Sequence, residues 1–195
     1  ALLLGVAMGN ILNGLPIDAA GDMRITLLEM LNPYALLIGV TTVAMLALHG
    51  ALYLEMKTEG ELQERATKSV PSLMVAFAAL LALCFVATVA FRSHLTTNFQ
   101  TYIWPLIFPL GAVIALALAW RMVQRRQYVK AFVASAAMIA LLVMTVSAGM
   151  FPNMLISNID AAHNLTIYNG ASADNTLTVM LVIALVGMPI VLLYT

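Results

Sequence analysis

The chain has 195 residues, of which 63% are hydrophobic and 9% are charged, with nine basic and nine acidic residues. A soluble domain is about a quarter charged, so a chain this poor in charge cannot cover its surface with groups that water solvates. The balanced charge gives no reason to expect a nucleic-acid partner. The composition therefore indicates a protein whose main solvent is the lipid bilayer.

The hydrophobic residues form long runs separated by short polar stretches. The first run, residues 1–14, is too short to cross a bilayer, which needs about 20 residues, and we interpret it as a partial span of a longer polypeptide. Five runs of full length follow, and their uniform apolarity is typical of helices rather than of barrel strands: 33–54, 70–91, 102–120, 131–150 and 175–195. The sequence predicts one domain, an all-α polytopic transmembrane helical bundle.

Two helix starts carry local signals. Asn32 precedes Pro33, which places a capping side chain before a proline at the first helical position, where the missing N–H costs nothing. Ser69 precedes Pro71 by two residues, and we expect the next span to begin there in a similar way. Both boundaries agree with the hydrophobic runs.

The basic residues indicate the orientation of the chain. Loops 55–69 and 121–130 together hold seven of the nine, and loops that carry an excess of Lys and Arg face the cytoplasm. These two loops alternate with loops that are poor in basic residues, as the predicted number of spans requires. The seven residues are Lys57, Arg65, Lys68, Arg121, Arg125, Arg126 and Lys130.

His49 is the one ionisable residue that lies well inside a predicted span. An ionisable group in the membrane is a functional hypothesis by default, so His49 could ligate haem, relay protons, take part in quinone chemistry, or simply bond to a neighbouring helix. Haem ligation is disfavoured because no partner histidine or methionine lies four residues after His49. A packing histidine is the favoured interpretation.

Glu55, Lys57 and Glu59 lie at the end of the same span. They could form an ordinary interfacial helix end, dock a partner subunit, or guide protons. His94 and His163 lie in loops without metal-ligand spacing. We therefore assign no catalytic, cofactor-binding or metal residue, and keep His49 with these three as candidates for a proton path or a subunit contact.

Small and polar residues mark the partial first span. Gly5 and Gly9 have the small-xxx-small spacing that lets two helices approach closely. Asn10 and Asn13 follow, and their amides are suited to hydrogen bonds between helices. Both features predict packing rather than chemistry.

Several stretches resemble subunit II of the cytochrome bd quinol oxidases, including their cyanide-insensitive relatives. The more specific ones are His49–Gly60, which reads HGALYLEMKTEG, and Asn164–Asn169, which reads NLTIYN. Further likeness lies in Asn32–Gly39 and around Phe151-Pro152. The resemblance extends over the whole chain, with generic apolar helices between these stretches.

This resemblance implies a membrane complex that oxidises quinol and reduces dioxygen in a bacterial plasma (inner) membrane. The family fold is a pair of four-helix bundles with a peripheral helix, of which this chain would hold the C-terminal half of one subunit. The haems, expected as b and d, belong to the partner, subunit I, whereas subunit II is haem-free. The resemblance also allows for a structural quinone in subunit II and for a small single-span accessory subunit.

A secondary transporter or channel component is the alternative. Pro109 and Pro189 fall inside predicted spans, and kinked helices can line a site at the middle of the membrane. No carboxylate or lysine lies at mid-membrane in the sequence to bind a coupling ion, which favours the oxidase hypothesis.

Overall fold

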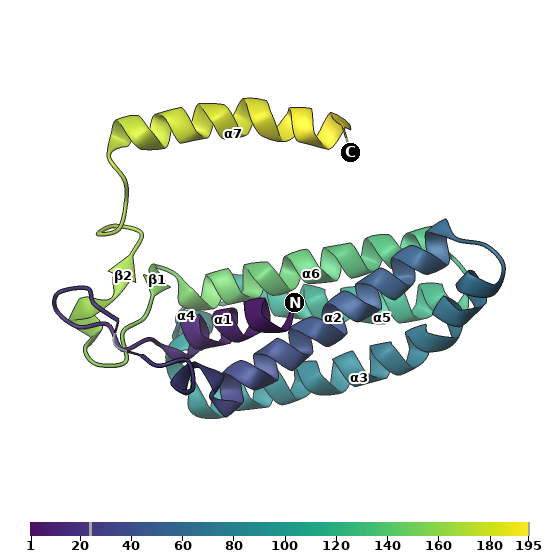
Figure 1. Cartoon of the computed structure of the whole chain (residues 1–195), viewed down its shortest axis with the longest axis horizontal. Helices are drawn as coiled ribbons and strands as arrows, with labels where there is room; N and C mark the ends of the chain where they lie inside the picture. The colour runs from purple at the N-terminus through teal and green to yellow at the C-terminus, as the bar shows by residue number, and fades with distance from the viewer. Residues whose placement is uncertain (24, 195) are drawn as a thin grey trace.

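The computed structural model describes residues 1–23 and 25–194 as a helical protein (Figure 1). Five of its helices are long and apolar enough to cross a membrane, which confirms the predicted class. Its α-helices are α1 (Leu2–Asn13), α2 (Pro33–Lys57), α3 (Glu61–Phe91), α4 (Thr97–Thr101), α5 (Ile107–Gln124), α6 (Tyr128–Met150) and α7 (Asp174–Tyr194). Four 3-10 turns, η1 (Glu29–Leu31), η2 (Ser93–Leu95), η3 (Trp104–Leu106) and η4 (Ala161–His163), and two strands, β1 (Asn153–Leu155) and β2 (Leu165–Thr166), complete it.

The long helices form a bundle centred on α2, which packs against α1, α3 and α6, while α5 packs against α6. The short connections 58–60 and 125–127 lie at one end of the bundle, and the longer loops 14–32 and 151–173 at the other (Figure 1). We call the first the basic end, because Lys57, Arg125 and Arg126 lie there, and the second the loop-rich end.

The main core lies between α2, α3, α5 and α6. Side chains of different size fill it: Phe77 and Met74 from α3, and Leu48 and Leu52 from α2, are at most 1% exposed. Alanines such as Ala131 complete the contact and bring the α6 backbone close. Large and small residues on facing helices thus interdigitate.

α1 lies against α2 with almost no space between the backbones. A Cβ atom added to Gly9 would lie 2.6 Å from the Cα of Ala35, and one added to Gly5 would lie 2.7 Å from the Cα of Gly39. The predicted close packing of the two glycines is confirmed. Glycine is needed at these positions because any side chain would enter the neighbouring backbone.

Asn10 joins the same helices by hydrogen bonds. Its amide nitrogen donates to the carbonyl oxygens of Val6 (2.9 Å) and Met30 (2.7 Å). Its amide oxygen accepts from the side chain of Asn32 at 2.8 Å, and Asn32 in turn caps α2 by accepting from the N–H of Ala35 at 2.9 Å. The predicted cap is confirmed, and the buried amide of Asn10 is satisfied.

The start of α3 differs from the prediction. The helix begins at Glu61 rather than at residue 70, so that Ser69 and Pro71 lie inside it. Its polar first turns are solvated and carry an ion pair between Arg65 and Glu61 at 2.6 Å. Pro71 cannot donate to the preceding turn, but the Ser69 hydroxyl donates to the carbonyl of Ala66 at 2.8 Å.

The other predicted prolines behave differently from each other. Pro109 is the third residue of α5, where the absent N–H has no partner to lose, so the expected kink does not arise there. The span predicted from residue 102 begins instead with the 3-10 turn η3. Pro189 does lie in the interior of α7.

The loop-rich end contains a small element that the sequence analysis missed. β1 and β2 pair antiparallel, and the loop between them lies against the segment after α1. Leu15 pairs with Ser157 in an isolated bridge, and the Ser157 hydroxyl donates to the carbonyl of Ile17 at 2.8 Å. The first and last loops of the bundle are thereby joined.

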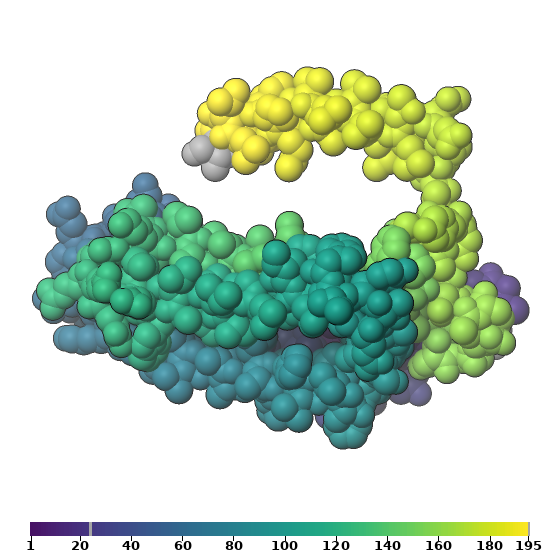
Figure 2. All heavy atoms as spheres, turned by 180° about the vertical axis from the view of Figure 1, so that it is seen from behind, coloured from purple at the N-terminus to yellow at the C-terminus, as the bar shows by residue number. Residues whose placement is uncertain are grey.

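α7 extends from this end and runs beside the bundle without packing on it (Figures 1 and 2). None of its described residues is buried, although it has the length and hydropathy of a membrane span. Thr195, the last residue of the predicted span, lies outside the described residues.

Candidate functional site at the basic end

His49 lies on the face of α2 that meets α6. Its Nδ1 is 2.8 Å from the hydroxyl of Ser135, and its ring stacks on Phe132 with 4.6 Å between centroids. Ser135 is buried, and its hydroxyl also donates to the carbonyl of Phe132 at 2.7 Å. These contacts are what a packing histidine needs, and they involve two residues that the sequence offered no means of pairing with His49.

Glu55 is completely buried at the last turn of α2. Neither carboxyl oxygen has a hydrogen-bond partner among the residues that the structure describes. The Thr67 side chain of α3 lies beside the carboxyl, but not in hydrogen-bond geometry. A buried, unpartnered carboxyl is costly, so Glu55 is the most unusual polar group of the bundle.

Lys57 and Glu59 are exposed, unlike Glu55. Lys57 is the last residue of α2, where a positive charge favours the helix dipole. Glu59 lies in the three-residue connection to α3, which the Gln63 amide supports by donating to the backbone carbonyl of Glu55 at 3.0 Å. Both charged groups are therefore free to meet a partner.

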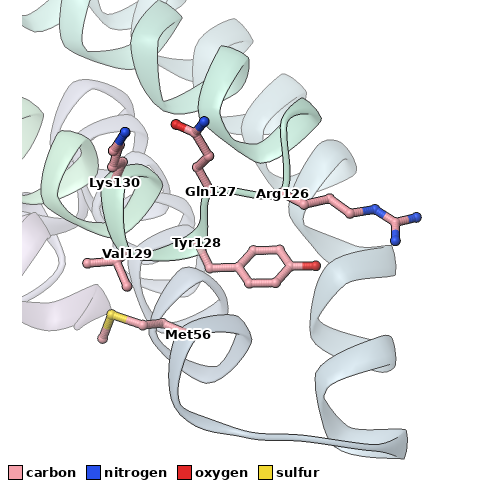
Figure 3. A pocket seen from close by; sticks show the side chains of 6 residues that line it. All are labelled: Met56, Arg126, Gln127, Tyr128, Val129 and Lys130. Carbon is pink, nitrogen blue, oxygen red and sulfur yellow. The ribbon is translucent and has the colours of Figure 1, made fainter.

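A shallow cavity of about 350 Å³ lies beside this connection (Figure 3). Met56 forms one wall and the turn between α5 and α6 the other, with Tyr128 between them. Arg126 adopts a left-handed backbone conformation (φ 55°), and the side chains of Arg126 and Lys130 point to opposite sides of the turn (Figure 3). The lining thus combines two basic side chains, Arg126 and Lys130, with apolar ones such as Met56.

The side chains of the four candidate residues do not line up as one continuous path of polar groups. His49 and Glu55 are six residues apart on α2, so their side chains point about 120° away from each other around the helix. His49 faces α6 and Glu55 faces α3. The structure thus separates the four into a histidine that contacts α6, an interior carboxyl, and two exposed charges.

Taken together, bilayer-length apolar helices with charged groups at their ends define a multi-pass helical membrane protein. The chain matches the family described as cytochrome bd terminal oxidase subunit II over residues 1–195, and it belongs to this family. The family resemblance seen in the sequence is confirmed, and membership decides against the transporter alternative.

Individual relatives agree. The chain is 31% identical over 191 residues to a protein of Bacillus subtilis named cytochrome bd ubiquinol oxidase subunit 2, with 97% of the chain and 55% of that protein covered. It is 32% identical over 226 residues to the Escherichia coli K12 protein named cytochrome bd-I ubiquinol oxidase subunit 2, with 100% and 59% covered. A Haemophilus influenzae protein named probable cytochrome oxidase subunit 2 gives the same figures. The chain thus spans little more than half the length of these relatives.

The family carries haem, and the histidines of this chain do not fit a haem site. Haem iron is held by side chains such as histidine that face an open pocket. His49 is bonded to Ser135, and ring nitrogens of His94 and His163 lie 3.1 and 3.2 Å from backbone carbonyl oxygens. None of the three lines the cavity beside Met56 or a second cavity between the ends of α1, α2 and α3.

Proposed function

We propose that the chain is the C-terminal part of a haem-free subunit that supports the haem-bearing subunit I of a quinol:oxygen oxidoreductase. The observation that carries the proposal is the family match over residues 1–195. The partial coverage of the relatives supports the view that further helices complete the subunit. In this assembly the haems, b and d, are held by subunit I, and the pair of four-helix bundles is completed by the remaining helices. A structural quinone and a small accessory subunit stay expectations from the resemblance.

We place the basic end in the cytoplasm of a bacterial cell, with the loop-rich end outside. The support is the charge asymmetry, since Lys57, Arg125 and Arg126 lie together at one end. Single cysteines at Lys57 and at Asn158 give a direct test in whole cells, after Cys84 is replaced by alanine. A membrane-impermeant thiol reagent should label the cysteine at position 158 and not the one at position 57. The opposite pattern would reverse the orientation.

We assign the two exposed charges at the basic end to subunit contact and the interior carboxyl to proton movement. Lys57 and Glu59 are accessible and unpaired among the described residues, as side chains awaiting a partner would be. Glu55 is buried, so its carboxyl can exchange a proton with water or with another group only if a path to it opens. Their separate surroundings support separate roles.

The test uses the intact complex made from the full-length gene. Purified complex should show haem in a reduced-minus-oxidised spectrum, and the haem should stay with the larger partner chain when the subunits are separated. Deleting the subunit should abolish oxygen consumption with quinol. A complex without haem, or full quinol oxidation without this subunit, would refute the proposal.

Lys57→Ala and Glu59→Ala should weaken co-purification of the partner, whereas Arg65→Ala, which removes a charge already paired with Glu61, should not. Equal behaviour of all three variants would remove the contact assignment.

A further inference from the structure

A second cavity, of about 370 Å³, lies at the loop-rich end, between the end of α1, the start of α2 and the end of α3. Its lining residues are Asn13, Asn32, Pro33, Tyr34, Leu37, Ala87, Phe91 and Arg92. The lining changes character along the helices, with polar side chains at the helix ends and apolar ones about one turn further in. Such a cavity suits an amphiphile whose polar group stays at the membrane surface.

Arg92 supplies the charge of this cavity and has bonding capacity to spare. One terminal nitrogen of its guanidinium donates to the carbonyl of Phe91 at 2.8 Å. Its Nε is buried and has no hydrogen-bond partner among the described residues. No carboxylate belongs to the described lining. A guanidinium presents parallel donors that match the oxygens of a phosphate.

The guanidinium is held in place before any ligand arrives. Its Cζ atom lies 5.1 Å from the centre of the Tyr34 ring. The ring is itself fixed, because Tyr34 is 8% exposed and its hydroxyl lies 2.9 Å from that of Thr88. A cation stacked on a rigid ring loses little freedom on binding a ligand.

Asn13 provides the complementary group. Its amide oxygen is buried and accepts no hydrogen bond from the described part of the chain. The neighbouring Asn32, in contrast, is already committed to Asn10 and to the cap of α2. Arg92 and Asn13 both line the cavity, and each keeps a polar atom without a hydrogen-bond partner among the described residues. A ligand that carries both an anion and a hydrogen-bond donor would match this pair.

We propose that this cavity binds the headgroup of a membrane phospholipid, with the phosphodiester on the Arg92 guanidinium, the terminal amine or hydroxyl of the headgroup on the Asn13 oxygen, and the first acyl carbons along Leu37 and Ala87. The volume lies near the lower limit for ligand pockets, which fits a headgroup better than a whole lipid. Phe91 is 72% exposed, so the wall that it forms is not covered by the described residues and the cavity is open on that side. The proposal depends on the chain lying in a membrane, and not on the role of the subunit in the oxidase.

The experiment measures lipid retained by the intact complex. Delipidated complex is incubated with phosphatidylethanolamine or phosphatidylglycerol, with diacylglycerol, which lacks the phosphate, or with inorganic phosphate, and the bound molecules are counted by native mass spectrometry. We expect one tightly retained phospholipid and no comparable retention of diacylglycerol. Arg92→Gln should lower its affinity at least about tenfold, because a charge-assisted bond is lost. Arg92→Lys, which keeps the charge without the fork, should give an intermediate value.

Two further variants make the result specific to this cavity. Asn13→Leu keeps a side chain of similar size but removes the amide oxygen that would accept from the headgroup, so it should also weaken retention. Arg121→Gln is the matched control, because Arg121 is an exposed arginine near the basic end and lies outside the cavity. Equal retention in Arg92→Gln and Arg121→Gln would overturn the proposal. Binding of inorganic phosphate alone, equal retention of diacylglycerol, or a quinone in place of the phospholipid would overturn it as well.

Discussion

The contact between α1 and α2 can be tested by adding a single methyl group. In Gly9→Ala the new Cβ would lie 2.6 Å from the Cα of Ala35 and 3.1 Å from its carbonyl oxygen. Carbon atoms in ordinary contact are about 3.5–4.0 Å apart, so α1 would have to move by about 1 Å. Both obstructing atoms belong to the backbone of α2 and cannot rotate away. We therefore expect the backbones of α1 and α2 to move apart at this position, because no side-chain rotation can relieve the clash.

The magnitude follows from two opposing effects. Overpacking of this kind costs about 1–3 kcal/mol, while alanine stabilises a helix by about 0.5–1 kcal/mol relative to glycine. Gly9→Ala should therefore destabilise the protein by up to about 2.5 kcal/mol. Gly50→Ala is the matched control: it lies in α2, and a Cβ there would meet no described atom within 4 Å. It should stabilise the protein by about 0.5–1 kcal/mol.

The assay is reversible unfolding of the full-length subunit in detergent, followed by circular dichroism as the fraction of a denaturing detergent rises. The two substitutions are chemically identical, so the difference between their free energies of unfolding isolates the contact between the helices. A Gly9→Ala variant that is as stable as Gly50→Ala would show that α1 and α2 are not in backbone contact.

Three further predictions concern polar groups. Ser135→Ala should cost about 0.6 kcal/mol of stability, which is typical of a hydrogen bond between membrane helices. His49→Asn should leave quinol-oxidase turnover nearly intact. A steep loss of turnover in His49→Asn would instead make His49 a proton relay. Glu55→Leu removes an unsatisfied buried group and should stabilise the subunit by about 1–3 kcal/mol. Quinol-oxidase turnover should be lost in this variant if the carboxyl carries protons. A destabilised variant would reveal a partner for Glu55 in the complex. The backbone N–H and then the hydroxyl of Thr26 lower the pKa of Glu29 below its ordinary 4.5, so its contribution to stability is full above pH 4.5 and is lost as the pH falls through the lowered value. Glu29→Gln should flatten that part of the pH dependence of the unfolding midpoint, and an unchanged profile would contradict the assignment.

Hydropathy was enough to predict the class of the fold, because a bilayer demands long apolar helices whatever their neighbours are. Local chemistry also predicted the start of α2, where Asn32 caps the helix through a bond that spans three residues. The close approach of α1 to α2 was predictable in kind from the spacing of Gly5 and Gly9. Each of these features depends on residues that are near one another in the sequence.

The prediction of helix ends failed where a helix extends beyond the apolar run that hydropathy detects. The apolar run that begins near residue 70 marks where lipid begins, whereas α3 begins at Glu61 because its first turns are stabilised in water by Arg65 and its partner. Hydrogen bonds between residues far apart in the sequence could not be predicted either. Ser135 meets His49 across 86 residues, and Ser157 meets Ile17 across 140. No periodicity in the sequence encodes which polar groups will face each other once the helices assemble.

The bridge between Leu15 and Ser157 has a consequence for biosynthesis. The segment after α1 is synthesised before its partner, the loop around Ser157, which emerges only after α6 has been made. Until then the carbonyl of Ile17 lacks the Ser157 hydroxyl that donates to it in the folded protein. A pause in translation before residue 157 should therefore leave an intermediate in which this segment is sensitive to proteases. Cleavage within residues 14–23 should thus fall sharply once the nascent chain is long enough to expose the late loop.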